Sequence, residues 1–154
     1  MQKYQKGCTK ESIREAFSVS RDIGIKTVAT FILGLPEDNR VLISETIRFA
    51  KEIDCDYASF NIAVPRPGTL LREIAISEGL IRKDSLVFDH SGCSVSTLSR
   101  HLSKEELSRL RKRAIREFYL RPSYIFKKLM AMKSFTELKE HIRECIGLLA
   151  GNAG

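Results

Sequence analysis

The sequence contains no uninterrupted apolar stretch near the roughly 18 residues that a membrane-spanning helix requires, which argues against a membrane-spanning protein. The first residues, MQKYQKGCTKES, include no apolar signal-peptide core, so we expect a cytoplasmic protein. Internal repeats are also absent. The 154 residues, of which 43% are hydrophobic and 29% charged, instead predict a globular domain with a real core.

Closely spaced cysteines are missing as well. The four cysteines lie far apart, at Cys8, Cys55, Cys93 and Cys145, and we interpret them as buried or inert thiols. A loose set made by His90, Cys93 and His101 could hold a metal ion, but tetrahedral sites usually show tighter paired spacing. We therefore predict no metal site.

The net charge of +7 is distributed unevenly along the chain. Residues 1–99 carry 13 basic and 13 acidic side chains, whereas residues 100–154 carry 13 basic and 6 acidic ones. The two parts therefore have different surfaces, and a basic surface favours acidic partners.

The first part, residues 1–79, alternates between helical and strand patterns. Helices are predicted from Thr9 to near Gly24, from a cap at Asp38 or Asn39 to Ile53, and from Thr69 to Glu78. Strands are predicted at residues 26–33 (KTVATFIL) and 57–64 (YASFNIAV). This order predicts an α/β fold with a parallel sheet, and the first strand is apolar on both faces, as a covered parallel strand should be.

The second part is predicted to be helical. Residues 80–102 are serine-rich without a sustained period, so we interpret them as a loop or linker. Residues 103–154 form a basic segment of three predicted helices, starting at a capping box of Ser103 and Glu106, at Pro122, and at a second capping box of Ser134 and Glu137. The apolar face of the third helix is predicted at Phe135, Leu138, Ile142, Ile146 and Leu149.

The first strand runs into a turn that carries two acids, TFILGLPEDN. Alternation places Thr30, Ile32 and Gly34 on one face, and Gly34 would let a flat ligand approach the backbone closely. Glu37 and Asp38 lie where a helix begins, so helix capping and ligand binding are both open as their purpose. Turns after parallel strands are where α/β folds bind ligands.

The second strand also carries polar residues before a stiff turn. Ser59 and Asn61 share one face, where the amide either satisfies neighbouring backbone or lines a pocket. The turn at residues 65–69 (PRPGT) makes Arg66 project at the same sheet end as Glu37. Arg66 is either part of a structural turn or a contact for an anionic substrate.

Three stretches in order, GIKTVATFILGLPEDN, TIRFAKEID and FNIAVPRPGT, resemble the C-terminal half of the radical S-adenosylmethionine (radical SAM) barrel, in the group that carries a cobalamin-binding domain. The tail, LSKEELSRLRKRAIREFYLRPSYIFKKL, resembles the same family, and the resemblance runs from about residue 5 to residue 130. The fold it implies is a partial, TIM-like half barrel of βα units followed by a C-terminal helical segment.

The resemblance also implies roles for individual residues. Ile32 would pack on the adenine of S-adenosylmethionine, and Gly34 and Glu37 match the same motif, whereas Thr30 stands where a glycine is expected. The strand from Phe60 to Val64, which holds Asn61, Ile62 and Val64, would hydrogen-bond the adenine edge through its backbone, and Asn61 would face the lumen. The residues that would contact substrate are Ser59 and Arg66. The sequence does not name that substrate.

The cluster-binding motif of that family, C-x3-C-x2-C, is absent. The interpretation is therefore a C-terminal fragment of a radical SAM enzyme, inactive alone, whose parent would use S-adenosylmethionine, a [4Fe–4S] cluster and in some members cobalamin, none of them held firmly by this chain. Open sheet edges predict pairing with the missing N-terminal half of the barrel, or self-association. The alternative is a module that binds nucleic acid or a protein partner through the basic helix bearing Arg109, Arg111, Lys112, Arg113 and Arg116.

Overall fold

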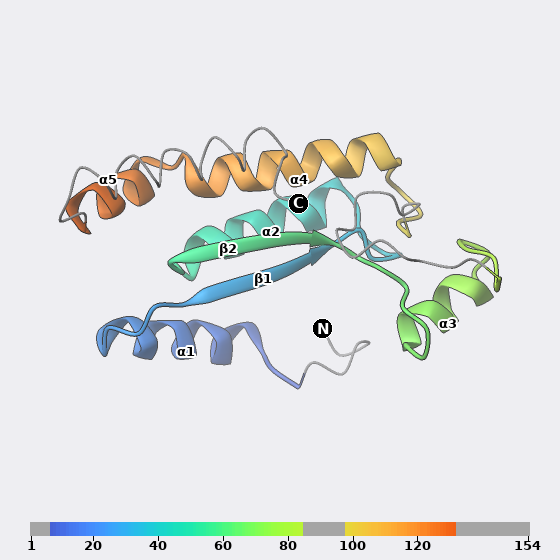
Figure 1. The fold of residues 1–154 in the computed structure, drawn as a ribbon, viewed down its shortest axis with the longest axis horizontal. Helices are drawn as coiled ribbons and strands as arrows, with labels where there is room; N and C mark the ends of the chain where they lie inside the picture. Colours follow the sequence, from blue (N-terminus) through green and yellow to red (C-terminus); the bar gives the residue numbers. More distant parts are fainter. Residues whose placement is uncertain (1–6, 85–97, 132–154) are drawn as a thin grey trace.

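The computed structural model describes residues 7–84 and 98–131 (Figure 1). The helices are α1 (Lys10–Asp22), α2 (Arg40–Glu52), α3 (Leu70–Ser77), α4 (Lys104–Tyr119) and α5 (Pro122–Ala131). The strands are β1 (Val28–Leu33) and β2 (Tyr57–Ile62). The predicted α/β class is confirmed for these residues.

The two strands pair in parallel, in a register that runs from Val28 opposite Tyr57 to Leu33 opposite Ile62. Helix α2 connects them and lies against one face of the sheet, next to α4, while α3 lies beyond the end of β2 (Figure 1). Helix α1 contacts α2, because Arg14 forms an ion pair with Glu52 and its guanidinium lies 5.3 Å from the ring centre of Phe49. Helices α1, α2 and α4 thus lie on the same face of the sheet.

The core lies between the sheet and helices α2 and α4. Strand residues such as Leu33 and Phe60 meet Ile43 and Ile47 of α2 and Phe118 of α4, all of them buried. The ring centres of Phe60 and Phe118 lie 6.3 Å apart in an edge-on arrangement. This geometry stabilises an aromatic pair by more than the burial of the two rings alone. This packing makes α4 part of the same core as the strands.

Local sequence signals predicted the helix boundaries well. The caps at Thr9, Asn39 and Ser103 are confirmed, and Ser103 and Glu106 form the predicted capping box. Thr69, the predicted start of the third helix, caps α3. Pro122 begins α5 as expected. Both strands are shorter than predicted. Strand β1 begins at Val28, because Lys26 and Thr27 bind the side chain of Asp56, and β2 ends at Ile62.

The expectation that β1 is covered on both faces was wrong for the described residues. Val28, Thr30 and Ile32 are exposed, because α1, α2 and α4 all lie on the other side of the sheet. No barrel is present among residues 7–84 and 98–131, where the sheet has two strands. The division at residues 1–79, 80–102 and 103–154 stays a prediction, and the third tail helix with its capping box at Ser134 lies outside the described residues.

No helix in the described ranges combines the length and the apolar character needed to cross a membrane. The cytoplasmic location stays a prediction from the sequence.

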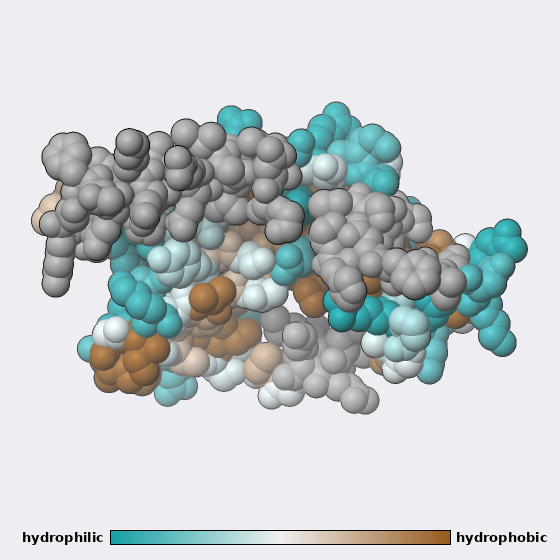
Figure 2. Space-filling model, viewed as in Figure 1, coloured by the Kyte–Doolittle hydropathy of each residue, from teal (hydrophilic) through white to brown (hydrophobic). Residues whose placement is uncertain are grey.

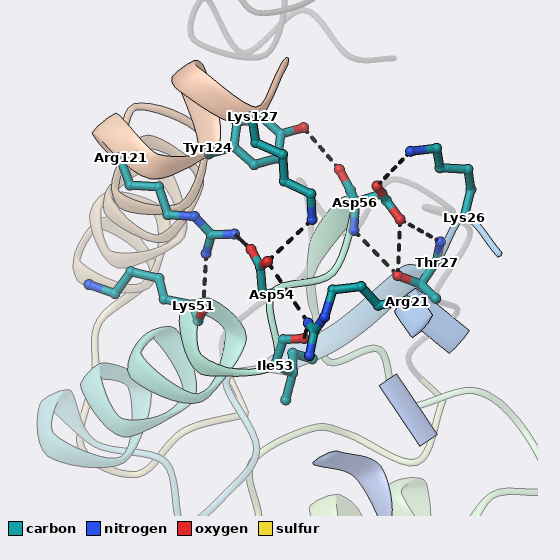
Figure 3. Close-up of polar contacts among 10 residues, drawn as sticks. All are labelled: Arg21, Lys26, Thr27, Lys51, Ile53, Asp54, Asp56, Arg121, Tyr124 and Lys127. Atoms are coloured by element: carbon teal, nitrogen blue, oxygen red, sulfur yellow. Dashed lines mark hydrogen bonds and ion pairs between the residues drawn. The ribbon is translucent and has the colours of Figure 1, made fainter. Parts of the chain in front are cut away.

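A polar cluster joins the helices at the N-terminal ends of the strands (Figure 3). Asp54, in a left-handed conformation with a φ of 47°, accepts hydrogen bonds from Arg121 at 2.8 Å and from Lys127 at 3.2 Å. Arg21 of α1 lies 3.9 Å from the same carboxylate. One acidic side chain therefore links α1 and α5 to the turn between α2 and β2.

Candidate functional site

Four of the predicted site residues, Thr30, Ile32, Ser59 and Asn61, form a square on the face of the sheet that no described helix covers. We call this face the open face. The register places Thr30 beside Ser59 and Ile32 beside Asn61. The amide of Asn61 donates to the hydroxyl of Ser59 at 3.1 Å, so the two polar side chains are held together. Ile32 is 47% exposed, which leaves an apolar surface directly beside that polar pair.

The turn after β1 brings further predicted residues to the C-terminal edge of the sheet. Asp38 does not cap α2, a role taken by Asn39; its carboxylate instead accepts from the backbone N–H groups of Gly34 at 2.8 Å and Leu35 at 3.1 Å. Burial raises the pKa of Asp38, and the charge of Glu37 raises it further, while these two backbone hydrogen bonds lower it less. The acid therefore holds the turn in shape rather than facing solvent.

The structure explains why position 34 is a glycine, which the sequence did not reveal. Its φ is +83°, and a side-chain carbon there would lie 2.5 Å from the Leu107 side chain of α4. Glycine thus permits both the turn and the close packing of α4. The role of Gly34 in approaching a ligand stays a prediction.

The turn after β2 lies at the same edge of the sheet. The ladder continues one step beyond the strand, because the N–H of Ala63 donates to the carbonyl of Leu33 at 2.8 Å. Arg66 is exposed on the following turn, whereas the side chain of Ile62 packs towards the core. The face predicted to bind ligand therefore receives Ser59 and Asn61 but not the Ile62 side chain. The contributions of Val64 and of Glu37, both half-buried, stay predictions.

Sequence reasoning missed a segment that packs against this edge. Leu98 and Ser99 are buried; the Ser99 hydroxyl donates to the Asp38 carbonyl at 2.7 Å, and the N–H of Arg100 donates to the Pro36 carbonyl at 3.1 Å. The available signal was Leu102, which precedes the cap Ser103 and lies five residues before Leu107. That spacing is typical of a hydrophobic staple, and both leucines are buried.

The thiols and histidines do not form a metal site in the described part of the chain, where no three His, Cys, Asp or Glu side chains come together. Cys8 is exposed and Cys55 is buried, and burial raises the pKa of the Cys55 thiol to about 11. His101 is exposed, while His90, Cys93 and Cys145 lie outside the described residues.

The basic helix α4 offers a second surface. A wide, open depression of about 650 Å³ is lined by Arg109, Lys112, Arg113, Arg116, Glu117, Leu120 and Arg121. Two of these basic side chains make contacts within the protein. Arg113 forms an ion pair with Glu117 at 2.6 Å, and the guanidinium of Arg121 lies 4.4 Å from the ring centre of Phe118. Arg111 turns inward, donating to the carbonyl of Phe60 at 2.7 Å. Nucleic-acid binding by this surface stays a prediction.

Comparison with known proteins gives one informative relative. No family model matches the chain. An uncharacterized methyltransferase of Pyrococcus horikoshii is 35% identical over 138 residues. The match covers 90% of this chain and 30% of that protein, so the chain spans less than a third of its relative's length.

This relative corrects the interpretation as a fragment of a radical SAM enzyme, which was wrong. The relative is named as a methyltransferase, and neither that name nor the described residues point to an iron–sulfur cluster or a cobalamin. The predicted [4Fe–4S] cluster, the reductive cleavage of S-adenosylmethionine and the cobalamin-dependent transfer are therefore withdrawn. The residues on the open face remain candidate ligand contacts, because that prediction does not depend on the family.

Proposed function

We propose that this chain is part of a methyltransferase that uses S-adenosylmethionine as its methyl donor, and that the open face of the sheet contributes to the donor site. The observation that carries the first half is the 35% identity, over nearly the whole chain, to a protein named as a methyltransferase. The second half depends on the chemistry of the exposed strand residues. The acceptor substrate remains outside the proposal.

The open face offers the kinds of group that S-adenosylmethionine needs. Its adenine is a flat ring with an apolar face and a polar edge, and its ribose carries two hydroxyls. Ile32 supplies exposed apolar surface, while Asn61 and Ser59 supply donors and acceptors beside it. Ligand sites in parallel α/β sheets lie at the carboxyl ends of strands, which is the half of the strands where Ile32 and Asn61 lie.

We also propose that the β1–β2 pair belongs to a larger curved sheet with helices outside and ligand inside. Helices α1, α2 and α4 share one side of the pair, and the other side carries the polar residues. A barrel of βα units has this distribution. In such an arrangement the methyl group passes from the donor sulfur to an acceptor nucleophile, and the part of the relative outside the matched 30% is long enough to supply further residues of the site.

The test is a nuclear magnetic resonance titration of the isotopically labelled chain with S-adenosylhomocysteine, the product that remains after methyl transfer. Because one chain would supply only part of the site, ligand is added to millimolar concentrations. We expect the amide signals of residues 30–34 and 59–63 to shift together. Absence of shifts, or shifts confined to α4, would contradict the proposed donor site.

Matched variants locate the contact on the open face. Ile32→Asp places a charge at the proposed adenine contact and should abolish the shifts. Val28→Asp makes the same chemical change on the same strand and face, but at the opposite end, and should preserve them. Equal behaviour of the two variants, with both still folded by circular dichroism, would show that Ile32 has no special contact with the ligand.

A further inference from the structure

The outer edge of β2 is occupied by side chains from the C-terminal helices. The bonds from the N–H of Tyr57 to the carbonyl of Thr27 and from the N–H of Ala63 to the carbonyl of Leu33 show that odd-numbered residues face across the β1–β2 ladder. The backbone groups of even-numbered residues in β2 therefore point outwards. These are the groups that an additional strand on this side would need.

Three side chains bind those outward groups. The hydroxyl of Tyr119 accepts from the N–H of Ala58 at 3.1 Å and donates to its carbonyl at 2.9 Å. Arg111 donates to the carbonyl of Phe60 at 2.7 Å, and the hydroxyl of Tyr124 donates to the carbonyl of Asp56 at 2.9 Å. All three come from α4 and α5. We call this side the capped edge.

The outer edge of β1 has no such caps among residues 7–84 and 98–131. The same alternation directs the backbone N–H and C=O groups of Val28, Thr30 and Ile32 away from β2, and no described side chain bonds them. An edge of this kind is a template for a further strand. We call this side the open edge.

The surface beside the open edge is apolar. Val28 is 65% exposed, and Ile23 and Ile25, which connect α1 to β1, are 65% and 56% exposed. Helix α1 has an apolar side yet no fully buried residue. Figure 2 shows apolar surface gathered at the C-terminal end of α1 and, separately, near the sheet. Water-exposed apolar groups next to unpaired backbone indicate an interaction surface.

We propose that the open edge receives one further β-strand, parallel to β1, from a segment that precedes α1 in a protein of the relative's length. Helix α1 leads directly into β1 and lies on the same side as α2. Because parallel crossovers are right-handed, a strand preceding α1 takes the place beside β1 and covers the apolar side of α1. The relative is long enough to supply it, since the match covers only 30% of its length.

This proposal does not depend on the methyl donor. It rests on the larger sheet proposed above and concerns the plane of that sheet, whereas the donor site concerns one face, so the added strand and the donor site can fail separately. It also replaces the earlier expectation of pairing at both edges with pairing at one.

The test measures amide hydrogen exchange in this chain and in the full-length Pyrococcus horikoshii relative, at aligned positions. In the chain alone we expect fast exchange at Val28, Thr30 and Ile32 and slow exchange at Ala58. In the relative, the positions aligned with the first three should exchange at least about 100-fold more slowly, because a paired strand must open first. Equally fast exchange in the relative would overturn the proposal.

The remaining outcomes identify other occupants. Slow exchange at Thr30 in the chain alone at every concentration would mean that the chain's own residues cover the edge. Protection that appears only as concentration rises would mean a second copy. Either result overturns the proposal. As a control, Tyr119→Phe frees the N–H of Ala58, whose exchange should accelerate while Thr30 is unchanged.

Discussion

Replacing Tyr119 by phenylalanine tests how much the capped edge contributes to stability. The substitution removes one hydroxyl and keeps the ring, whose centre lies 4.9 Å from that of Phe118 and 5.3 Å from that of Tyr124. The lost hydroxyl bonds both the N–H and the carbonyl of Ala58, a residue that is 7% exposed. Both backbone groups are therefore left without this partner in a place with little access to water.

The expected cost follows from the two bonds. A hydrogen bond contributes about 1 kcal/mol net, and leaving a buried partner unsatisfied costs about 1–3 kcal/mol. We therefore expect Tyr119→Phe to lower the free energy of unfolding by about 2 kcal/mol. With a urea dependence of about 1.5 kcal/mol per molar, the unfolding midpoint should fall by roughly 1 M.

Urea unfolding followed by circular dichroism measures this shift, with Tyr57→Phe as the matched control. Tyr57 is 38% exposed, and its ring keeps its contact with Lys128, whose ammonium lies 4.1 Å from the ring centre. The control should change stability by less than about 0.5 kcal/mol. If both variants shift the midpoint equally, the hydroxyl of Tyr119 does not cap the strand as described.

Two further predictions concern titratable groups. Because the folded state raises the pKa of Asp38, the stability that its protonated carboxyl contributes is fully present below its ordinary pKa and is lost as pH rises through the raised folded pKa. The stability of Asp38→Asn relative to the wild type should therefore increase as pH rises through that range, and a difference independent of pH in urea unfolding would contradict this. Burial and a pKa of about 11 should protect Cys55 from iodoacetamide at about pH 8 while exposed Cys8 reacts, as peptide mapping by mass spectrometry can show; alkylation of Cys55 without urea would refute its buried placement.

The sequence predicted those features that depend on near neighbours in the chain. The caps at Thr9, Asn39 and Ser103 bond N–H groups two or three residues away, so their patterns are visible in short windows. Alternation likewise placed Ser59 and Asn61 on one face. These features account for most of the helix boundaries and for the square of residues on the open face.

The features that sequence reasoning missed depend on contacts between distant residues. Tyr119 meets Ala58 across 61 positions, and Arg111 meets Phe60 across 51, so no local pattern reveals the capped edge. The apolar character of Val28 and Ile32 predicted cover that the described residues do not supply. The family interpretation depended on short motifs, one of which has Thr30 in place of a glycine, and the relative named as a methyltransferase overturned it.

The capped edge limits how many partners the sheet can take. A sheet with two open edges has two binding positions in its plane and can grow into a chain of any length, as fibrils do. With Tyr119, Arg111 and Tyr124 at the capped edge, the residues that the structure describes leave the β1–β2 sheet one position for a further strand, beside β1. Further strands can therefore be added only on the β1 side, and β2 stays the last strand of the sheet, because the hydroxyl of Tyr119 takes the place of a neighbouring strand.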